Sequence, residues 1–313
     1  MIAETPKQTH PTPGAGQARE LVVISGKGGT GKTSVVASFA ALAEQAVLAD
    51  GDVEASDLHL VLAPRVQRRE DFTGGRRAKI DPAQCLACGI CAKLCRFEAI
   101  LFNGPGHGDV ARTYRVDDIG CEGCGVCAEF CPNGAASMTE SVGGEWFVSE
   151  TRYGPMVHAR LSAGHGNSGK LVNIVRDQAR CIASETGRTL IVVDGPPGIG
   201  CPVIASITGA SLALVVTEPT PSGIHDLLRV LKLAKHFDLP AAVCVNKWDL
   251  NPALTEHIER ESVSAGAHVA GRISYCDTFN EAQRRGRAVV ENGDSRAARE
   301  IRQVWATLQP LIS

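Results

Sequence analysis

Eight of the twelve cysteines fall into two runs with one spacing, and this doubled pattern constrains the fold more than any other feature of the chain. Each run reads Cys-x2-Cys-x2-Cys-x3-Cys. Such spacing brings three thiolates to one iron–sulfur cubane, while the fourth cysteine reaches the cluster of the other run. The pattern therefore predicts one [4Fe–4S] cluster on Cys85, Cys88, Cys91 and Cys131 and a second on Cys121, Cys124, Cys127 and Cys95.

Disulfides and zinc are the alternative uses of these cysteines. Residues 1–16 are polar and Pro-rich and lack the apolar core of a signal peptide, so we expect a cytoplasmic protein. Thiols stay reduced in that compartment, which disfavours disulfides. Zinc sites usually take four ligands from separated Cys-x2-Cys pairs, which disfavours zinc. We therefore favour clusters.

A phosphate-binding motif stands upstream of the cysteines. The apolar run 21–24 predicts a buried strand, and residues 33–44 have helical composition. A glycine-rich loop between a strand and a helix is the context expected of a nucleotide site. We expect the nucleotide to be surrounded by Gly26, Lys27, Gly28, Gly29, Thr30, Gly31, Lys32, Thr33 and Ser34. Lys32 should reach the β- and γ-phosphates, and the Thr33 hydroxyl should hold Mg²⁺.

This loop resembles that of the MinD/ParA/Mrp/nitrogenase-iron-protein group of P-loop ATPases, whose deviant Walker A loop carries a second lysine, here Lys27. The resemblance implies an ATP-bound homodimer in which Lys27 acts on the nucleotide of the partner subunit, much as an arginine finger does. It runs from Leu21 to about Val290 and includes the segments 167–172, 195–205 and 245–249. Within the group, the chain is most similar to MinD-superfamily ATPases that contain an inserted ferredoxin domain.

Three acidic positions extend the predicted nucleotide site. The segment 47–54 ends a strand in Asp50-Gly-Asp52, and the resemblance assigns Asp52 to the attacking water. A helix-capping or solvated role stays open for either aspartate, since caps favour Asp. Asp194 follows a strand at 189–194, as a Walker B aspartate does, and should hold the Mg²⁺ shell through water. Gly198 lies in the switch that follows and is expected to sense the γ-phosphate through its N–H.

The predicted base contact lies in the segment Asn246-Lys247-Trp248-Asp249, which follows a strand at 241–246. Asn246 matches the base-contacting asparagine of the ATPase group, and an amide side chain can bond the adenine edge. The same run reads Asn-Lys-x-Asp, which selects guanine in GTPases through its Asp. The deviant loop favours ATP, and GTP stays open.

Cys201 lies seven residues after Asp194, the offset at which the nitrogenase iron protein holds a cluster between subunits. Asn167 stands where that protein has its other bridging cysteine, so two copies of Cys201 alone cannot complete a four-thiolate site. We interpret Cys201 as a small buried residue behind the switch. A transient site for metal passed between subunits is the alternative.

The order of strand and helix signals predicts an α/β fold with a doubly wound, mostly parallel sheet of the deviant Walker A type. A small α+β ferredoxin-like domain is inserted into it after a basic, Gly-containing stretch at 65–79. We expect a flexible tail at 1–19, the ATPase domain at 20–79 and 139–313, and the insertion at 80–138. A final helix at 295–311 should pack on the sheet, because it lacks the extended basic cluster of a membrane-surface helix.

Bulk properties exclude some functions. A net charge of −2 gives no electrostatic case for general nucleic-acid binding. No apolar run approaches the ~18 residues of a transmembrane helix. The sequence thus favours a dimeric ATPase that couples ATP hydrolysis to two clusters and gates electron transfer to a redox partner protein. A cluster carrier or assembly ATPase is one alternative, and a MinD/ParA-like positioning ATPase with a redox sensor is another.

Overall fold

The computed structural model describes residues 18–162 and 166–312, so most of the predicted tail at 1–19 lies outside the described residues. Clustering of contacts divides the chain into two compact units. Of the described residues, the first comprises 18–68, 147–159 and 172–312, and the second comprises 69–146, 160–162 and 166–171. The second unit begins before and ends after the predicted insertion at 80–138, and it takes in a second segment from beyond the insertion.

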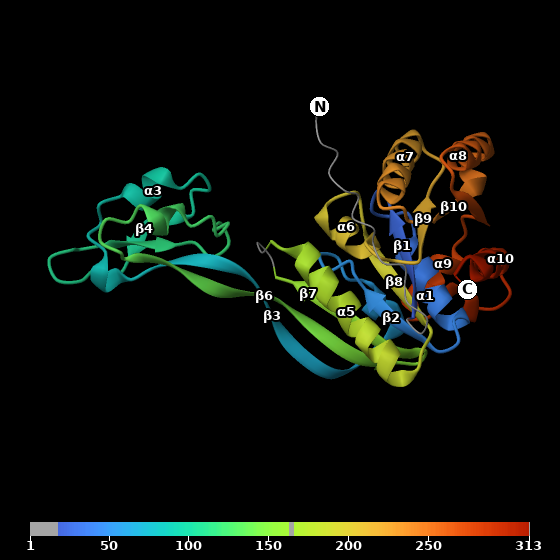
Figure 1. Ribbon diagram of the computed structural model, residues 1–313, viewed down its shortest axis with the longest axis horizontal. Helices are drawn as coiled ribbons and strands as arrows, with labels where there is room; N and C mark the ends of the chain where they lie inside the picture. The colour runs from blue at the N-terminus through green and yellow to red at the C-terminus, as the bar shows by residue number, and fades with distance from the viewer. Residues whose placement is uncertain (1–17, 163–165, 313) are drawn as a thin grey trace, which may run out of the picture. The chain divides into compact units, whose positions relative to one another are not determined.

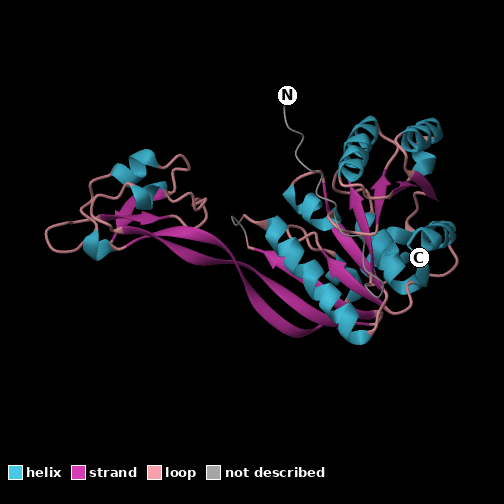
Figure 2. Ribbon diagram, viewed as in Figure 1, coloured by secondary structure: helices cyan, strands magenta, loops and turns pink. Residues whose placement is uncertain are grey.

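Strands and helices alternate along the first unit (Figures 1 and 2). Its strands are β1 (Arg19–Ser25), β2 (Ala46–Asp50), β8 (Leu190–Pro197), β9 (Leu212–Thr217), β10 (Ala241–Asn246) and β11 (His268–Ile273). Its helices are α1 (Lys32–Leu42), α2 (Leu58–Leu62), α6 (Cys201–Ile207), α7 (Pro221–His236), α8 (Pro252–Ser264), α9 (Thr278–Arg284) and α10 (Arg296–Ile312), with short 3-10 turns at Trp248–Leu250 and Val289–Glu291. Most of α5 (Ser168–Thr186) also belongs to this unit.

The sheet has the strand order β11-β10-β9-β1-β8-β2-β7-β6-β3, where β7 is Gly154–Leu161, β6 is Ala136–Thr151 and β3 is Arg65–Ile80. Every pairing from β11 to β7 is parallel. Only residues 152–153 separate β6 from β7, and a connection that short joins antiparallel strands. The predicted doubly wound, mostly parallel sheet is therefore confirmed.

The central strands are buried on both faces, as expected for a parallel sheet covered by helices. Leu21 and Val23 of β1 are fully buried in one apolar cluster with α1 and α10. Val22 and Ile24 alternate with them and are also fully buried, on the other side of the strand. This arrangement brings the carboxyl ends of β1, β2 and β8 to one edge of the sheet, where the loops that follow them meet.

The last helix packs on the sheet, as predicted. One face of α10, including Ala298, Ile301, Val304 and Leu308, is fully buried. It contacts β11, β1 and α1, and the Trp305 ring lies 4.9 Å from the ring of Phe39 in α1. The apolar face of this helix is thus covered within the chain. Among the described residues, no helix combines the length and apolar character needed to cross a bilayer.

The second unit is built on the outer parts of two long strands, β3 and β6. Its further elements are the 3-10 turn Pro82–Gln84, α3 (Ile90–Leu94), β4 (Ile100–Gly104), β5 (Thr113–Val116) and α4 (Val126–Glu129), and β4 pairs with β5 in an antiparallel ribbon. The stretch 65–79 was predicted only as a basic, Gly-containing segment, and in the structure it lies within β3. Most of its side chains are exposed, so the sequence shows no alternation of apolar and polar residues there. Its strand conformation is instead stabilised by pairing with β6.

Candidate functional site

The loop after β1 has the backbone geometry that its glycines allow. Gly29 and Gly31 have φ of 78° and 88°, values that side chains with a Cβ rarely adopt. A Cβ on Gly31 would lie only 2.3 Å from the Asn246 side-chain nitrogen. The loop therefore needs glycine at this position both for its turn and for close packing, and α1 begins immediately after it at Lys32.

Lys32 is surrounded by acidic side chains at the carboxyl ends of β2 and β8. Its Nζ is 2.5 Å from Asp194 Oδ1 and 3.8 Å from Asp52 Oδ2, and its side chain is only 6% exposed. Burial lowers the pKa of Lys32, but Asp194, Asp52 and Asp50 outweigh that and raise it. The lysine is therefore charged and is held by the surrounding aspartates.

The three aspartates differ in how they are satisfied. Asp50 is fully buried and accepts from Ser56 Oγ at 2.7 Å and from the N–H of Leu58, the first residue of α2. It thereby satisfies one backbone donor at the start of α2, whose N-cap residue is Asp57. Burial, reinforced by Asp194, raises the pKa of Asp50 to about 8. Burial also raises the pKa of Asp52 to about 6, against the lowering effect of Lys32.

Two buried polar atoms in this region have no hydrogen-bond partner among the described residues. They are Asp194 Oδ2 and Thr30 Oγ1. Unsatisfied buried oxygens are costly, and in native proteins they call for a partner such as water, an ion or a ligand. An acceptor oxygen on Asp194 beside the P-loop suits a water molecule of a Mg²⁺ shell. The donor set therefore fits the predicted Mg²⁺ and nucleotide phosphates.

Lys27, the second lysine of the loop, is held within its own chain. Its Nζ is 2.5 Å from Glu218 Oε1, and it also donates to the Thr220 and Ser222 hydroxyls. Glu218 Oε2 lies 3.1 Å from Lys247 Nζ, and Lys247 also donates to the Gly29 carbonyl at 3.3 Å. Burial raises the pKa of Glu218, but its bonds to the two lysines outweigh that and lower it. Glu218 therefore stays ionised and links both lysines.

Asn246 and Gly198 also reach the loop. Asn246 is 3% exposed, and its side chain donates to the Thr30 carbonyl at 2.7 Å and accepts from the Lys247 N–H. The predicted base-contacting residue thus ties the end of β10 to the P-loop. The Gly198 N–H donates to the Ser25 carbonyl at 2.8 Å, so a contact with a γ-phosphate requires that this bond be exchanged. Thr33 and Ser34 follow Lys32 in the first turn of α1.

The prediction for Cys201 is wrong. It was expected to be a small buried residue behind the switch, but its side chain is exposed at the first position of α6. The bend at residues 198–200 leads from β8 into α6, and both Gly200 and Cys201 are exposed there.

The eight cysteines of the two runs line two cavities of the second unit. One is lined by Cys85, Cys88, Cys91 and Cys131, and the other by Cys95, Cys121, Cys124 and Cys127. This is the four-and-four division that the sequence pattern predicts, with the last cysteine of each run crossing to the other set. Cys88 and Cys124 are exposed, so each cavity reaches the surface of the unit.

The two runs repeat one backbone conformation. The residue before the second cysteine has positive φ in both runs, Ala87 at 55° and Gly123 at 66°. The residue after it does too, Gly89 at 77° and Gly125 at 81°, and a short helix then begins. Left-handed residues turn backbone N–H groups toward one side of the chain, where they form concavities that bind anions. The repeat suits a loop wrapped around an anionic group with thiolate ligands.

The thiols interact within these sets. Burial raises the pKa of Cys91 to about 11, and the neighbouring Cys85 and Cys88 thiolates add to the effect. For Cys131, burial raises the pKa, but four backbone N–H groups from residues 133–136 outweigh it and lower the value. Among the described residues, no three His, Cys, Asp or Glu side chains converge as a single metal ion requires. A cubane spreads its thiolates around four irons, so cysteines that line a cavity fit it better than a single ion.

Glu218 and Lys247 are functional candidates that the sequence analysis did not predict. They contact Lys27 and the P-loop only in the folded structure. Glu218 follows β9 directly, and β9 is the neighbour of β1 in the sheet. A polar residue just past the carboxyl end of a strand beside the P-loop strand is the signal that could have found it.

A family of known proteins matches most of the chain. The family described as the CobQ/CobB/MinD/ParA nucleotide binding domain matches residues 21–289. An uncharacterized protein of Methanocaldococcus jannaschii is 30% identical over 267 residues, which cover 83% of this chain and 90% of that protein. A second uncharacterized protein of the same organism is 32% identical over 60 residues, 19% of this chain and 22% of its own length.

Solved structures share the fold. The MinD of a MinC:MinD cell division complex from Aquifex aeolicus matches with a TM-score of 0.56 and 18% identity, covering 94% of this chain and 96% of that one. The cell division ATPase MinD of Pyrococcus furiosus matches with a TM-score of 0.53 and 17% identity, covering 94% and 99%. The MinD of Pyrococcus horikoshii, solved with Mg-ADP, matches with a TM-score of 0.51 and 16% identity, covering 92% and 94%.

Proposed function

Because the chain belongs to the CobQ/CobB/MinD/ParA family and is a P-loop ATPase of the MinD/ParA type, we propose that it is a dimeric switch whose second unit carries two [4Fe–4S] clusters and delivers electrons to a partner protein. The observation that carries the proposal is the pair of cavities, each lined by four cysteines drawn from both runs. Clusters held there would supply one-electron transfer at potentials set by the surrounding protein.

The chain's own residues support a switch at the nucleotide. An incoming phosphate attracts Lys32 away from Asp194, which frees both oxygens of that carboxylate for the Mg²⁺ shell. Asp52 lies within 4 Å of the same lysine, and this proximity supports the role we propose for it in orienting the attacking water. In the proposed dimer, the nucleotide bound to the partner subunit draws Lys27 away from Glu218. Binding therefore exchanges internal ion pairs for contacts with the nucleotide.

A covalent route leads from this site to the second unit. The loop that carries Asp52 continues into α2, and β3 begins three residues after that helix ends. Arg152, in the turn between β6 and β7, donates to the carbonyls of Val61 and Leu62 at the end of α2 and pairs with Glu291. Within the first unit, both β3 and the end of β6 are thus connected to α2, the helix that follows Asp52. A small shift of α2 would move their starting points.

The test is an anaerobic measurement on the full chain. We expect about eight iron and eight sulfide per chain, an absorption band and electron-paramagnetic signal of reduced [4Fe–4S] clusters, and a reduction potential that differs between the ATP-bound Asp52→Ala variant and the nucleotide-free protein. Colourless, iron-free protein would refute the cluster assignment. Equal potentials together with equal partner capture from anaerobic extract, with and without ATP, would refute the coupling.

A cluster carrier is the second candidate, and the exposure of Cys88 and Cys124 favours it, because labile clusters need accessible ligands. Transfer of iron from the loaded chain to an apo-ferredoxin, followed by circular dichroism, separates the two. Rapid transfer supports a carrier, whereas clusters retained through many turnovers of ATP support electron delivery.

A further inference from the structure

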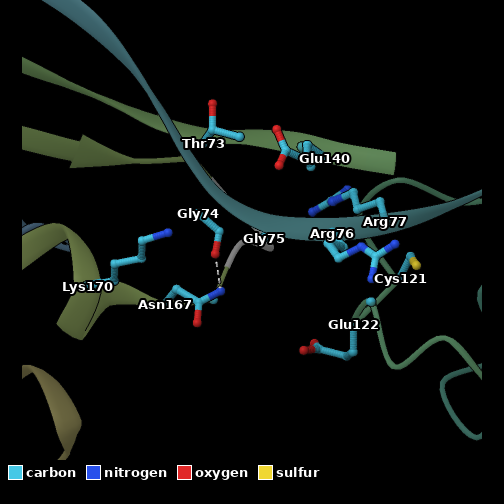
Figure 3. Close-up of a pocket in the computed structure, with 13 residues that line it drawn as sticks. Thr73, Gly74, Gly75, Arg76, Arg77, Cys121, Glu122, Glu140, Asn167 and Lys170 are labelled. Atoms are coloured by element: carbon cyan, nitrogen blue, oxygen red, sulfur yellow. Dashed lines mark hydrogen bonds between the residues drawn. The ribbon is translucent and has the colours of Figure 1, made fainter. Parts of the chain in front are cut away.

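A polar cavity, distinct from the two cysteine cavities, lies within the second unit and has a volume of about 420 Å³. Figure 3 shows Asn167 and Lys170 on one side of it, Arg76, Arg77 and Glu122 on the other, and the strand that carries Gly74 and Gly75 between them. All of its lining residues belong to the second unit. The volume lies within the range of small-molecule sites. We call this cavity the polar pocket.

Two close contacts fix the cation-bearing segments around the polar pocket. The Asn167 side chain donates to the Gly74 carbonyl, which joins the start of α5 to β3 (Figure 3). On the other side, a Cβ on Gly123 would lie 2.0 Å from the Arg76 carbonyl, so this glycine lets the cysteine loop lie directly against β3. The backbones that carry Lys170 and Arg76 are therefore held at set positions rather than on free loops.

The charges lining the polar pocket favour an anion. Arg76, Arg77 and Lys170 contribute three positive charges, and Glu122 and Glu140 contribute two negative ones. Arginine binds carboxylate and phosphate oxygens through paired N–H donors, and lysine adds a point charge. The two carboxylates can accept from hydroxyl or amino groups elsewhere on a ligand. We propose that the polar pocket binds a small polar molecule that carries a phosphate or carboxylate group.

The position of the polar pocket implies what such a ligand does. Cys121, Glu122 and Gly123 line both this pocket and the second cysteine cavity, so the two share one wall. An anion on the far side of that wall repels an added electron on a cluster bound by Cys121 and therefore makes its reduction harder. The ligand is thus a small anionic effector of that cluster's potential. This second step depends on the proposed function, whereas binding itself does not.

The experiment is calorimetric titration of the full, cluster-loaded chain with inorganic phosphate and, in a separate arm, with succinate. The P-loop is first saturated with Mg²⁺ and a non-hydrolysable ATP analogue. We expect one saturable site per chain for one of the two anions. Lys170→Ala and Arg76→Ala should each weaken that site by about tenfold, the usual worth of a charge-assisted hydrogen bond. Lys79→Ala serves as the matched control, because Lys79 lies on the same strand outside the pocket lining.

The outcomes test two claims separately: that the polar pocket binds an anion, and that the bound anion lowers the cluster's reduction potential. Binding lost in the two pocket variants and kept in the control supports the site. No saturable binding of either anion, or equal binding in all variants, overturns it. Iron content and ATP hydrolysis, measured on each preparation before the ATP analogue is added, should be unchanged, so their loss would report on folding or on the proposed function. A potential that does not fall on addition of the bound anion overturns the effector role alone.

Discussion

Replacing Glu218 by Gln should tighten the proposed ATP-dependent dimer, because Glu218 holds Lys27, the lysine that we propose to act on the nucleotide of the partner subunit. The Glu218 carboxylate lies 2.5 Å from Lys27 Nζ and 3.1 Å from Lys247 Nζ. The Lys27 side chain is 32% exposed, so the pair contributes only about 1 kcal/mol. Removing it makes release of Lys27 about fivefold easier, since 1.4 kcal/mol is a factor of ten. A symmetric dimer releases two such lysines, so its dissociation constant should fall by about 25-fold.

Sedimentation velocity with a non-hydrolysable ATP analogue measures this constant across a dilution series. Glu259→Gln is the matched control, because Glu259 forms an ion pair of similar exposure with Arg272, far along the chain from the P-loop. The hydrolysis rate per dimer should stay unchanged, since Lys27 itself remains. A Glu218→Gln dimer that is no tighter than the control, or that is weaker, would refute the idea that Glu218 restrains Lys27.

Three further predictions concern the nucleotide site and the cysteines. Lys32→Ala leaves buried Asp194 without its partner and should lower the free energy of unfolding of the nucleotide-free protein by about 3–5 kcal/mol, which urea denaturation measures. The raised pKa values of Asp50, about 8, and Asp52, about 6, mean that the folded state keeps protons that the unfolded state loses near pH 4. Their stabilisation is therefore complete below about pH 4 and is lost as pH rises through 6 to 8, and Asp50→Asn should flatten this slope in denaturation series across pH. Cys131→Ala should reduce bound iron by about half without altering ATP hydrolysis, and equal iron in this variant and the wild type would contradict the assignment of Cys131 to a cluster.

The parallel sheet and its P-loop were predictable because their signals are local. Short apolar runs such as 21–24 and 241–245 lead directly into loops that carry residues of the nucleotide site. The strands they form are buried on both faces, which gives these runs their continuous apolar character. The crossing of the two cysteine runs was also predictable, since spacing alone limits which thiolates can meet.

Three features could not be predicted, because they depend on contacts between residues that are distant in the sequence or on local exposure. β3 is mostly exposed and owes its conformation to pairing with β6, so its residues read as a basic loop. Glu218 pairs with both Lys27 and Lys247, two lysines that lie more than 200 positions apart in the sequence and that only the folded sheet brings together. The burial of Cys201 was wrongly inferred from its residue type, whereas its exposure depends on its position at the start of α6, after the bend that follows β8.

The chain enters and leaves the second unit through the paired strands β3 and β6. The Arg69 guanidinium donates to the Glu145 carboxylate, so the two crossing points are neighbours. The entropic cost of closing a loop grows only slowly with its length, so a long segment between adjacent ends costs its host little more than a short one. A short reverse turn could therefore replace the second unit, and the first unit would keep the paired ends of β3 and β6 without rearrangement of its sheet.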